Sequence, residues 1–288
     1  MTTLAIFGNS YQERHIAGLR KFFAHLAAKN FKVYIEKGFA SYLEGENVSI
    51  GSAVMVEDMP EDAECVVSIG GDGTFLQAAQ WAGECEIPIL GVNTGHLGFL
   101  ASYSLEDTDE LLSDVLEDRI RLERRAVIEV ECAAMPERFW PYALNEVAVL
   151  KGETASMVTV HADIDGYFLA DYMSDGLLIS TPTGSTAYNL SVGGPILQPT
   201  LSCLILSPIA PHSLTMRPLV VSGDSCIALT PRSREGDCRV SLDGRSFLMH
   251  SDDSLMLKEA RFKVNVVRRA DGNFSRLLRN KLGWATRP

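Results

Sequence analysis

Residues 70–74, Gly-Gly-Asp-Gly-Thr, combine the residue types that phosphoryl chemistry needs. They follow an apolar run typical of a buried strand and open a stretch with helical spacing. Glycines at such a turn leave backbone N–H groups uncovered, and the helix N-terminus adds partial positive charge, so the turn is suited to phosphate. It is not a Walker A loop, which requires a lysine, and Leu76 stands where a dinucleotide-binding fingerprint has its third glycine.

Asp72 is the informative residue of this loop, because a carboxylate among phosphate-directed N–H groups would repel phosphate unless it served another purpose. It could take the proton from a hydroxyl that attacks a phosphoryl group, or hold a magnesium ion. The alternative is a tight turn in which Asp72 caps the helix that follows. The spacing leaves both possibilities open.

Residues 175–195, with the sequence DGLLISTPTGSTAYNLSVGGP, form the most unusual stretch of the chain. Seven hydroxyl groups between 180 and 191, that of Tyr188 included, supply neutral hydrogen bonds, and the tyrosine ring offers a flat face to a base. Pro182 and Gly184 predict a turn, and Thr186 could begin a short helix whose N–H groups face a ligand. The alternative is an ordinary loop rich in Ser and Thr.

Asn145 and Glu146 open the otherwise apolar strand VAVL, which fits a strand end at a cleft. Glu146 could accept hydrogen bonds from ribose hydroxyls, and the Asn145 amide can both donate and accept. The alternative is that these two side chains are simply solvated at the end of a strand.

The first 120 residues alternate apolar runs with helical spacing, which predicts a doubly wound α/β domain with a parallel sheet. We expect strands at 4–9, 32–36, 65–71 and 87–93. We expect helices from 16 to about 30, over 74–82, and from the capping pair Ser104 and Asp107 to about 117.

From Arg121 onward, short β-branched runs separated by Asp-Gly turns predict an antiparallel β-sandwich. These runs lie at 126–132, 143–150, 157–164, 176–181, 225–230, 238–242 and 262–267. A last helix is expected over 273–282. The basic segment 258–288 carries apolar residues that need a core, so we expect it to fold back onto the acidic N-terminal part. The predicted domains are therefore 1–120, 121–268, and a C-terminal helix at 269–288 that packs on the first domain.

Composition excludes several classes of protein. The chain has 288 residues, a formal net charge of −11 and 46% hydrophobic residues, which is ordinary globular usage. A surface of this charge repels nucleic acid and anionic lipid. We expect no signal peptide and no membrane span, and the thinly spaced cysteines predict reduced thiols in the cytoplasm. His and Cys spacing predicts no zinc site made by the protein.

Several of these motifs, in this order, resemble those of the NAD kinase family. They are GGDGTFL (70–76), NTGHLGFL (93–100), LNEVAVLKG (144–152), DGLLISTPTGSTAYNLSVGGPI (175–196), PHSLTMRPLV (211–220) and KLGW (281–284). The resemblance runs from the first predicted strand to the last helix. GGDGT alone is shared with lipid kinases and phosphofructokinases, whereas the long hydroxyl-rich motif is specific.

The resemblance implies transfer of the ATP γ-phosphoryl group to the adenosine 2′-hydroxyl of NAD, giving NADP and ADP, with Mg²⁺ as cofactor. Asp72 would be the general base. The residues that match phosphate-cradling or NAD-binding positions of the family are Gly71, Gly73, Thr74, Asn145, Glu146, Asp175, Thr186, Ala187, Tyr188, Asn189, Leu190, Ser191 and, as secondary contacts, Ala210 and Arg245.

The same resemblance implies a homodimer or homotetramer in which the NAD site borrows residues from a neighbouring subunit. The chain departs from many relatives at Gln77, where a basic residue is common, and at Met173, where an arginine is common. Each change removes a possible charge-assisted bond to phosphate, worth about 1.5–3 kcal/mol. Two rivals remain: a lipid or sugar kinase that shares GGDGT, and a nucleotide-sensing protein without catalysis.

Overall fold

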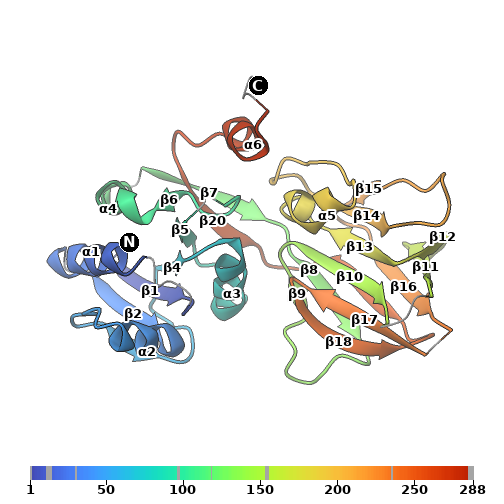
Figure 1. Cartoon of the computed structure of the whole chain (residues 1–288), viewed down its shortest axis with the longest axis horizontal. Coiled ribbons are helices and arrows are strands. Elements are labelled where there is room, and N and C mark those ends of the chain that lie inside the picture. Colours follow the sequence, from blue (N-terminus) through green and yellow to red (C-terminus); the bar gives the residue numbers. More distant parts are fainter. Residues whose placement is uncertain are drawn as a thin grey trace. The chain divides into compact units, whose positions relative to one another are not determined.

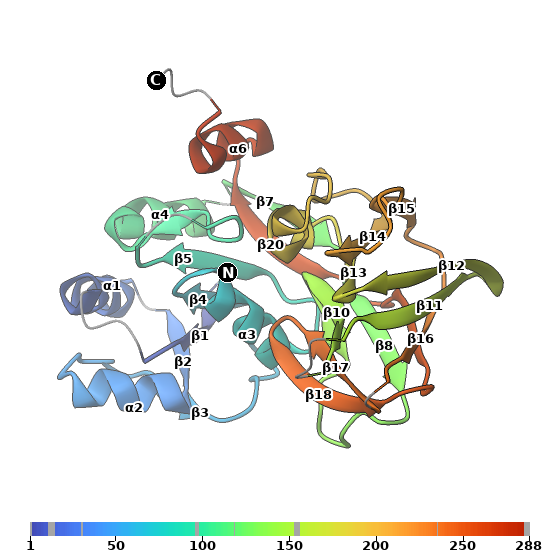
Figure 2. The ribbon, with the colours of Figure 1, turned by 45° about the vertical axis from the view of Figure 1, so that its right-hand side comes forward.

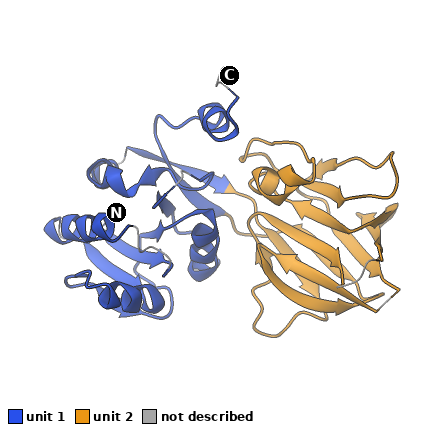
Figure 3. Cartoon of the chain, viewed as in Figure 1, with its two compact units in different colours: residues 1–124, 264–288 blue, residues 125–263 orange. Residues whose placement is uncertain are grey.

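A computed structural model describes residues 2–10, 15–29, 31–95, 98–117, 119–152, 156–234 and 236–284 of the chain. His96 and Leu97 of the 93–100 motif lie outside the described residues. The chain divides into two compact units, residues 1–124 with 264–288 and residues 125–263 (Figure 3). Within the described part of the chain, no helix is long and apolar enough to cross a membrane.

The first unit is an α/β domain built on one sheet, with strand order β3-β2-β1-β4-β5-β20-β7 and β6 paired to β5 (Figure 1). Its strands are β1 (Thr3–Gly8), β2 (Lys32–Glu36), β3 (Val54–Val56), β4 (Cys65–Ile69), β5 (Ile89–Asn93), β6 (Tyr103–Ser104), β7 (Ile120–Arg125) and β20 (Val264–Arg269). Its helices are α1 (Ile16–Ala28), α2 (Lys37–Gly45), α3 (Asp72–Ala82), α4 (Thr108–Leu116) and α6 (Phe274–Leu282). Neighbouring strands from β3 to β20 run parallel.

Helices cover both faces of this sheet, as a doubly wound fold requires. The apolar residues of α1, α2 and α4 share one core cluster with alternate residues of β1 and β4. The buried residues of α3, such as Phe75 and Ala78, lie outside that cluster, although α3 packs on β1, β4 and β5. Since successive strand side chains point to opposite faces, α3 covers the other face. All five residues of β4 are buried, as expected for a strand covered on both sides.

The strand expected at 262–267 belongs to a different sheet from the one predicted. It forms β20, which pairs parallel to β5 with Val266 opposite Ile89, and so it joins the α/β sheet instead of the sandwich. The β-branched residues of this segment predict a strand but do not say which sheet it joins. In the structure Val264, Val266 and Val267 are all buried, as expected for a central strand of a parallel sheet. The predicted return of the C-terminal segment to the N-terminal domain is confirmed.

The C-terminal helix α6 forms where the sequence predicts it. The Asn273 side chain accepts hydrogen bonds from the N–H groups of Ser275 (2.8 Å) and Arg276 (3.3 Å), and Gly283 ends the helix with φ +68°. Leu278 is buried, whereas the other apolar residues expected to dock the helix, Phe274, Leu277 and Leu282, are only partly covered. The strand β20, more than this helix, therefore fastens the C-terminal segment to its domain.

The second unit is an antiparallel β-sandwich of two six-stranded sheets (Figure 2). One sheet has the order β15-β14-β13-β10-β17-β18, with bounds β15 (Leu219–Ser222), β14 (Cys203–Ile209), β13 (Gly176–Ser180), β10 (Glu146–Lys151), β17 (Asp237–Leu242) and β18 (Arg245–His250). The other has the order β12-β11-β16-β19-β8-β9, with bounds β12 (Tyr167–Ser174), β11 (Val158–Ile164), β16 (Ile227–Arg232), β19 (Leu255–Glu259), β8 (Ile128–Cys132) and β9 (Tyr142–Ala143). Residues of both sheets share one apolar core, which confirms the predicted sandwich.

Candidate functional site

Asp72 is the first residue of α3, and Gly71 occupies the N-cap position before it. The Asp72 carboxylate accepts hydrogen bonds from the backbone N–H groups of Phe99 (2.8 Å to Oδ2) and Leu100 (3.0 Å to Oδ1). The alternative that Asp72 caps its own helix is therefore wrong. The carboxylate is instead held by a segment 27 residues further along the chain.

Close packing at Gly98 fixes this arrangement. A Cβ atom at position 98 would lie 1.9 Å from Oδ1 and 2.6 Å from Cγ of Asp72, so only glycine allows the two segments to meet in this way. Gly98 is buried and directly precedes the two residues whose N–H groups hold the carboxylate.

The phosphate-loop residues after Gly70 have a different environment. A Cβ atom at Gly71 or Gly73 would meet no protein atom within 4 Å, so packing inside the chain does not require glycine at either position. Thr74 is buried, and its Oγ1 accepts a hydrogen bond from the Asn9 side chain (2.8 Å) at the end of β1. The N-terminus of α3 thus presents uncovered backbone beside a fixed carboxylate.

In the second unit, Asp243 organises the strand end that carries Asn145 and Glu146. It occupies the Asp-Gly turn between β17 and β18 with φ +47°. Its carboxylate accepts from the backbone N–H groups of Leu144 (2.7 Å), Asn145 (2.9 Å) and Glu146 (3.0 Å). Burial raises the pKa of Asp243, against the effect of these three donors.

Glu146 is the most unusual titratable group of this unit. Burial, with the nearby Asp243 carboxylate, raises the pKa of Glu146 to about 7, while a hydrogen bond from the backbone of Tyr188 acts in the opposite direction. Its Oε2 is buried and has no hydrogen-bond partner within the described part of the chain. A carboxylate oxygen in this state is ready to accept from a ligand hydroxyl.

The buried hydroxyls of 180–185 hold their own loop, a role that the sequence did not indicate. Thr181 Oγ1 donates to the carbonyl of Leu144 (2.6 Å) and accepts from the N–H of Gly184 (3.1 Å). Ser185 Oγ donates to the carbonyl of Pro182 (2.7 Å), and the loop lies so close to β10 that a Cβ at Gly184 would be 2.1 Å from the Asn145 carbonyl oxygen. These bonds attach the loop to the strand end of Asn145 and Glu146.

The residues predicted at 186–191 divide by exposure. Asn189 is fully buried: its amide donates to the carbonyls of Ser185 (3.3 Å) and Pro195 (3.1 Å) and accepts from Ser207 (2.7 Å). By contrast, Tyr188 is 39% exposed. Ser191 is also exposed, and Thr186, Ala187 and Leu190 are partly exposed. The buried amide therefore shapes the turn, and the exposed side chains are the ones that can meet a ligand.

Asp175 and Ala210 lie at the other end of β13. In the register of β13 and β10, Ser180 is opposite Glu146 and Gly176 is opposite Leu150, so Asp175 is roughly 16 Å from the Ser180 end. Asp175 forms an ion pair with Lys151 (2.7 Å), and its N–H donates to the carbonyl of Ile209, next to Ala210. Ala210 has φ +46°, an uncommon conformation for a residue other than glycine.

Arg245, beside the Asp243 turn, donates to the backbone carbonyls of Trp140 (3.0 Å) and Tyr142 (2.6 Å). Burial lowers the pKa of Arg245, while the Asp243 carboxylate acts in the opposite direction. The two positions where the chain departs from many relatives, Gln77 and Met173, are both exposed.

The sequence did not single out Gly98 or Asp243 as parts of a site. Gly98 lies within the motif at 93–100, but its role depends on a contact with Asp72, which is distant in sequence. Asp243 belongs to one of the Asp-Gly turns that separate the predicted strands, and its sequence position alone indicates no more than a turn. The one sequence signal for Asp243 is its place in an Asp-Gly turn two residues before Arg245.

Comparisons with known proteins cover almost the whole chain. The family model described as ATP-NAD kinase N-terminal domain matches residues 4–120, and the ATP-NAD kinase C-terminal domain matches residues 144–269. Proteins named NAD kinase from Flavobacterium psychrophilum and Porphyromonas gingivalis are each 40% identical to it. The first match covers 98% of this chain and 97% of the relative, and the second covers 99% and 98%.

Two solved structures are similar in fold. Yeast NADH kinase complexed with NADH has a TM-score of 0.87 at 23% identity, covering 100% of this chain and 89% of that one. An NAD kinase from Archaeoglobus fulgidus in complex with ATP has a TM-score of 0.70 at 29% identity, covering 98% and 97%.

Proposed function

The chain belongs to the ATP-NAD kinase family, and we propose that Asp72 is the general base of its reaction. The enzyme transfers the γ-phosphoryl group of ATP to the adenosine 2′-hydroxyl of NAD, giving NADP and ADP. The observation that carries the role of Asp72 is its attachment to the N–H groups of Phe99 and Leu100. Because each carboxylate oxygen has a second acceptor direction, both remain able to take a hydroxyl proton.

ATP is bound by the start of α3. Gly71 and Gly73 permit close approach of phosphate oxygens to the backbone. Thr74 belongs to the same turn, where its hydroxyl oxygen accepts from the Asn9 side chain. Phosphoryl transfer depends mostly on positioning and on stabilising charge, which backbone N–H groups at a helix N-terminus supply.

NAD is bound by the second unit, where Asn145 and Glu146 hold the diphosphate and ribose region. The buried, unpartnered Oε2 of Glu146 supports this role. The base and ribose ends contact Asp175 and the segment Thr186, Ala187, Tyr188, Asn189, Leu190 and Ser191, with Ala210 and Arg245 as secondary contacts. The exposed ring of Tyr188 supports stacking against a base, whereas Asn189 acts through the shape of its turn.

Mg²⁺ would accompany the triphosphate, where it would supply positive charge to the transferred phosphoryl group. Among the described residues, no group of three or more His, Cys, Asp or Glu side chains is placed to hold a metal ion. Phosphate oxygens and water would supply most of the magnesium ligands, as is usual at nucleotide sites.

The enzyme is a homodimer or homotetramer, and it works in the cytoplasm. The resemblance to NAD kinases supports this proposal, and symmetric closure of identical subunits is the usual form of such assemblies. All six cysteines are free thiols, which suits a reducing compartment. Light scattering that finds a fully active monomer would contradict the first of these proposals.

Asp72→Asn tests the catalytic role directly. The amide is nearly the size of the carboxylate, but it cannot take a proton and can accept from only one of the two N–H groups that hold Asp72. We therefore expect kcat to fall by at least about 10²-fold while the Kd for NAD⁺ stays nearly unchanged. NADP⁺ formation from Mg-ATP and NAD⁺ is the assay, with diacylglycerol and fructose 6-phosphate as alternative acceptors. Near-normal turnover in the variant would refute the general-base role, and turnover of an alternative acceptor alone would favour the rival kinases.

A further inference from the structure

Arg268 is a buried cation that the phosphoryl-transfer mechanism above does not use. It lies in β20 and is only 8% exposed. Burial lowers the pKa of Arg268, and the carboxylates of Glu123 and Asp72 act in the opposite direction. Because burying a guanidinium is costly unless its donors are satisfied, its partners show what the position is used for.

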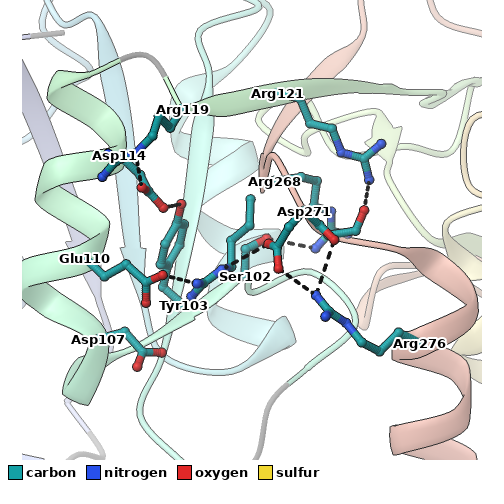
Figure 4. Close-up of polar contacts among 12 residues, drawn as sticks. Ser102, Tyr103, Asp107, Glu110, Asp114, Arg119, Arg121, Arg268, Asp271 and Arg276 are labelled. Atoms are coloured by element: carbon teal, nitrogen blue, oxygen red, sulfur yellow. Dashed lines mark hydrogen bonds and ion pairs between the residues drawn. The ribbon is translucent and has the colours of Figure 1, made fainter.

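Most of these donors go to the segment that holds Asp72. Nη2 donates to the carbonyl of Phe99 (2.7 Å), and Nη1 donates to the carbonyl of Leu100 (3.1 Å) and to Ser102 Oγ (3.2 Å). Figure 4 shows Arg268 reaching Ser102 from the C-terminal strand. Nε donates to Glu123 in β7 (3.2 Å), whose side chain is 14% exposed.

The bonds of Arg268 and Asp72 meet in one peptide group. The carbonyl of Phe99 and the N–H of Leu100 belong to the same peptide unit: the carbonyl accepts from Arg268, and the N–H donates to Asp72 Oδ1. Donation to a peptide carbonyl polarises the group and strengthens its N–H as a donor. The guanidinium also fixes the plane of this peptide, because its planar donors reach two successive carbonyls.

We infer that Arg268 is a positioning residue for catalysis, which orients the 99–100 peptide groups and through them the carboxylate of Asp72. Glu123 in turn orients Arg268, so the C-terminal strand β20 is part of the support of the general base. The inference rests on the proposed role of Asp72. This role explains why a charged residue occupies a buried position of β20, where an apolar side chain would stabilise the fold equally well.

The test compares Arg268→Gln and Arg268→Lys with Arg269→Gln, a neighbour in the same strand. Arg269 forms an ion pair with Glu110 and lies 5.2 Å from the ring centroid of Tyr103, away from residues 99 and 100. We expect Arg268→Gln to lower kcat by at least about 30-fold, because small misplacement of a catalytic group is costly in rate. Arg268→Lys, which keeps the charge but cannot reach both carbonyls, should lower kcat about 5- to 10-fold. Arg269→Gln should stay within about twofold of the wild type.

Two further measurements separate positioning from stability. Rates are divided by the number of sites that bind NAD⁺, and the Kd for NAD⁺ should remain within about threefold of the wild-type value. Hydrogen exchange at Leu100 should accelerate in both Arg268 variants and not in Arg269→Gln, since the N–H to Asp72 is released. If Arg268→Gln does not fold, the test depends on Arg268→Lys, through its kcat per binding site and its hydrogen exchange at Leu100.

Asp72→Asn is assayed in parallel so that two failures can be told apart. An inactive Asp72→Asn with normal kcat per site in the Arg268 variants would overturn the inference alone. Equal losses in the Arg268 and Arg269 variants, or losses that vanish when rates are divided by binding sites, would also overturn it. An active Asp72→Asn would instead refute the general-base role.

Discussion

Gly98→Ala offers a sharp test of how the candidate site is built, because the substitution adds one methyl group directly against the general base. The new Cβ would lie 1.9 Å from Oδ1, 2.6 Å from Cγ and 2.9 Å from Oδ2 of Asp72. Real Cβ atoms essentially never approach a heavy atom outside their own residue and its chain neighbours within 3.0 Å. The carboxylate, or the backbone that holds it, must therefore move.

The required movement sets the size of the effect. Restoring an acceptable contact shifts Asp72 by about 1 Å, and a misplacement of that size can cost about 10²-fold in rate. We therefore expect kcat to fall about 100-fold. The KM for NAD⁺ should change little, because the residues proposed to bind NAD lie in the other unit of the chain.

The assay is steady-state formation of NADP⁺, with the melting temperature and NAD⁺ binding measured on the same samples. Gly45→Ala is the matched control, because a Cβ at that position of α2 meets no atom within 4 Å. In an Asp72→Asn background, Gly98→Ala should add almost nothing, since the group that it displaces has already lost its function. A kcat within threefold of the wild type, or full additivity with Asp72→Asn, would refute the reasoning.

Three other outcomes are expected. The pKa of Glu146 is raised from 4.5 to about 7 in the folded protein, so the free energy of unfolding falls as pH rises between these values. Glu146→Gln should therefore be more stable than the wild type by about 1–3 kcal/mol at pH 8 in urea unfolding, and equally stable near pH 4. Ending the chain after Gly272 should lower the free energy of unfolding by about 1–2 kcal/mol, with little dependence on salt, because Leu278 is the buried residue of α6. Val266→Ala in β20 should lower it by at least as much. Gln77→Arg, on the exposed face of α3 one turn after Gly73, should lower the KM for ATP about 3- to 10-fold, and 0.5 M salt should remove the gain.

Local patterns in the chain predicted most of the individual elements. β2 and α6, the capping pair Ser104 and Asp107, and the strand-loop-helix unit around 65–82 form where periodicity and turn residues indicate. These signals are reliable because each depends on neighbours within one or two turns of the chain. The sequence pattern does not predict the helix α2, because its capping residue Glu36 also ends a strand pattern.

Which sheet a strand joins, and which side chains meet, depended on the tertiary structure. The pattern of β20 fits either unit, and only pairing with β5 places it in the α/β sheet. The types of Asp72 and Glu146 were evident from the chain, but the N–H groups of Phe99 and Leu100, the packing of Gly98 and the donors of Arg268 come from segments far apart in sequence. The sequence likewise indicates that the hydroxyls at 180–185 donate to a ligand, whereas in the structure Thr181 donates to the carbonyl of Leu144 and Ser185 to that of Pro182. Residue type limits what a group can do, whereas its partners, and therefore its orientation and charge state, are set by contacts that no local pattern encodes.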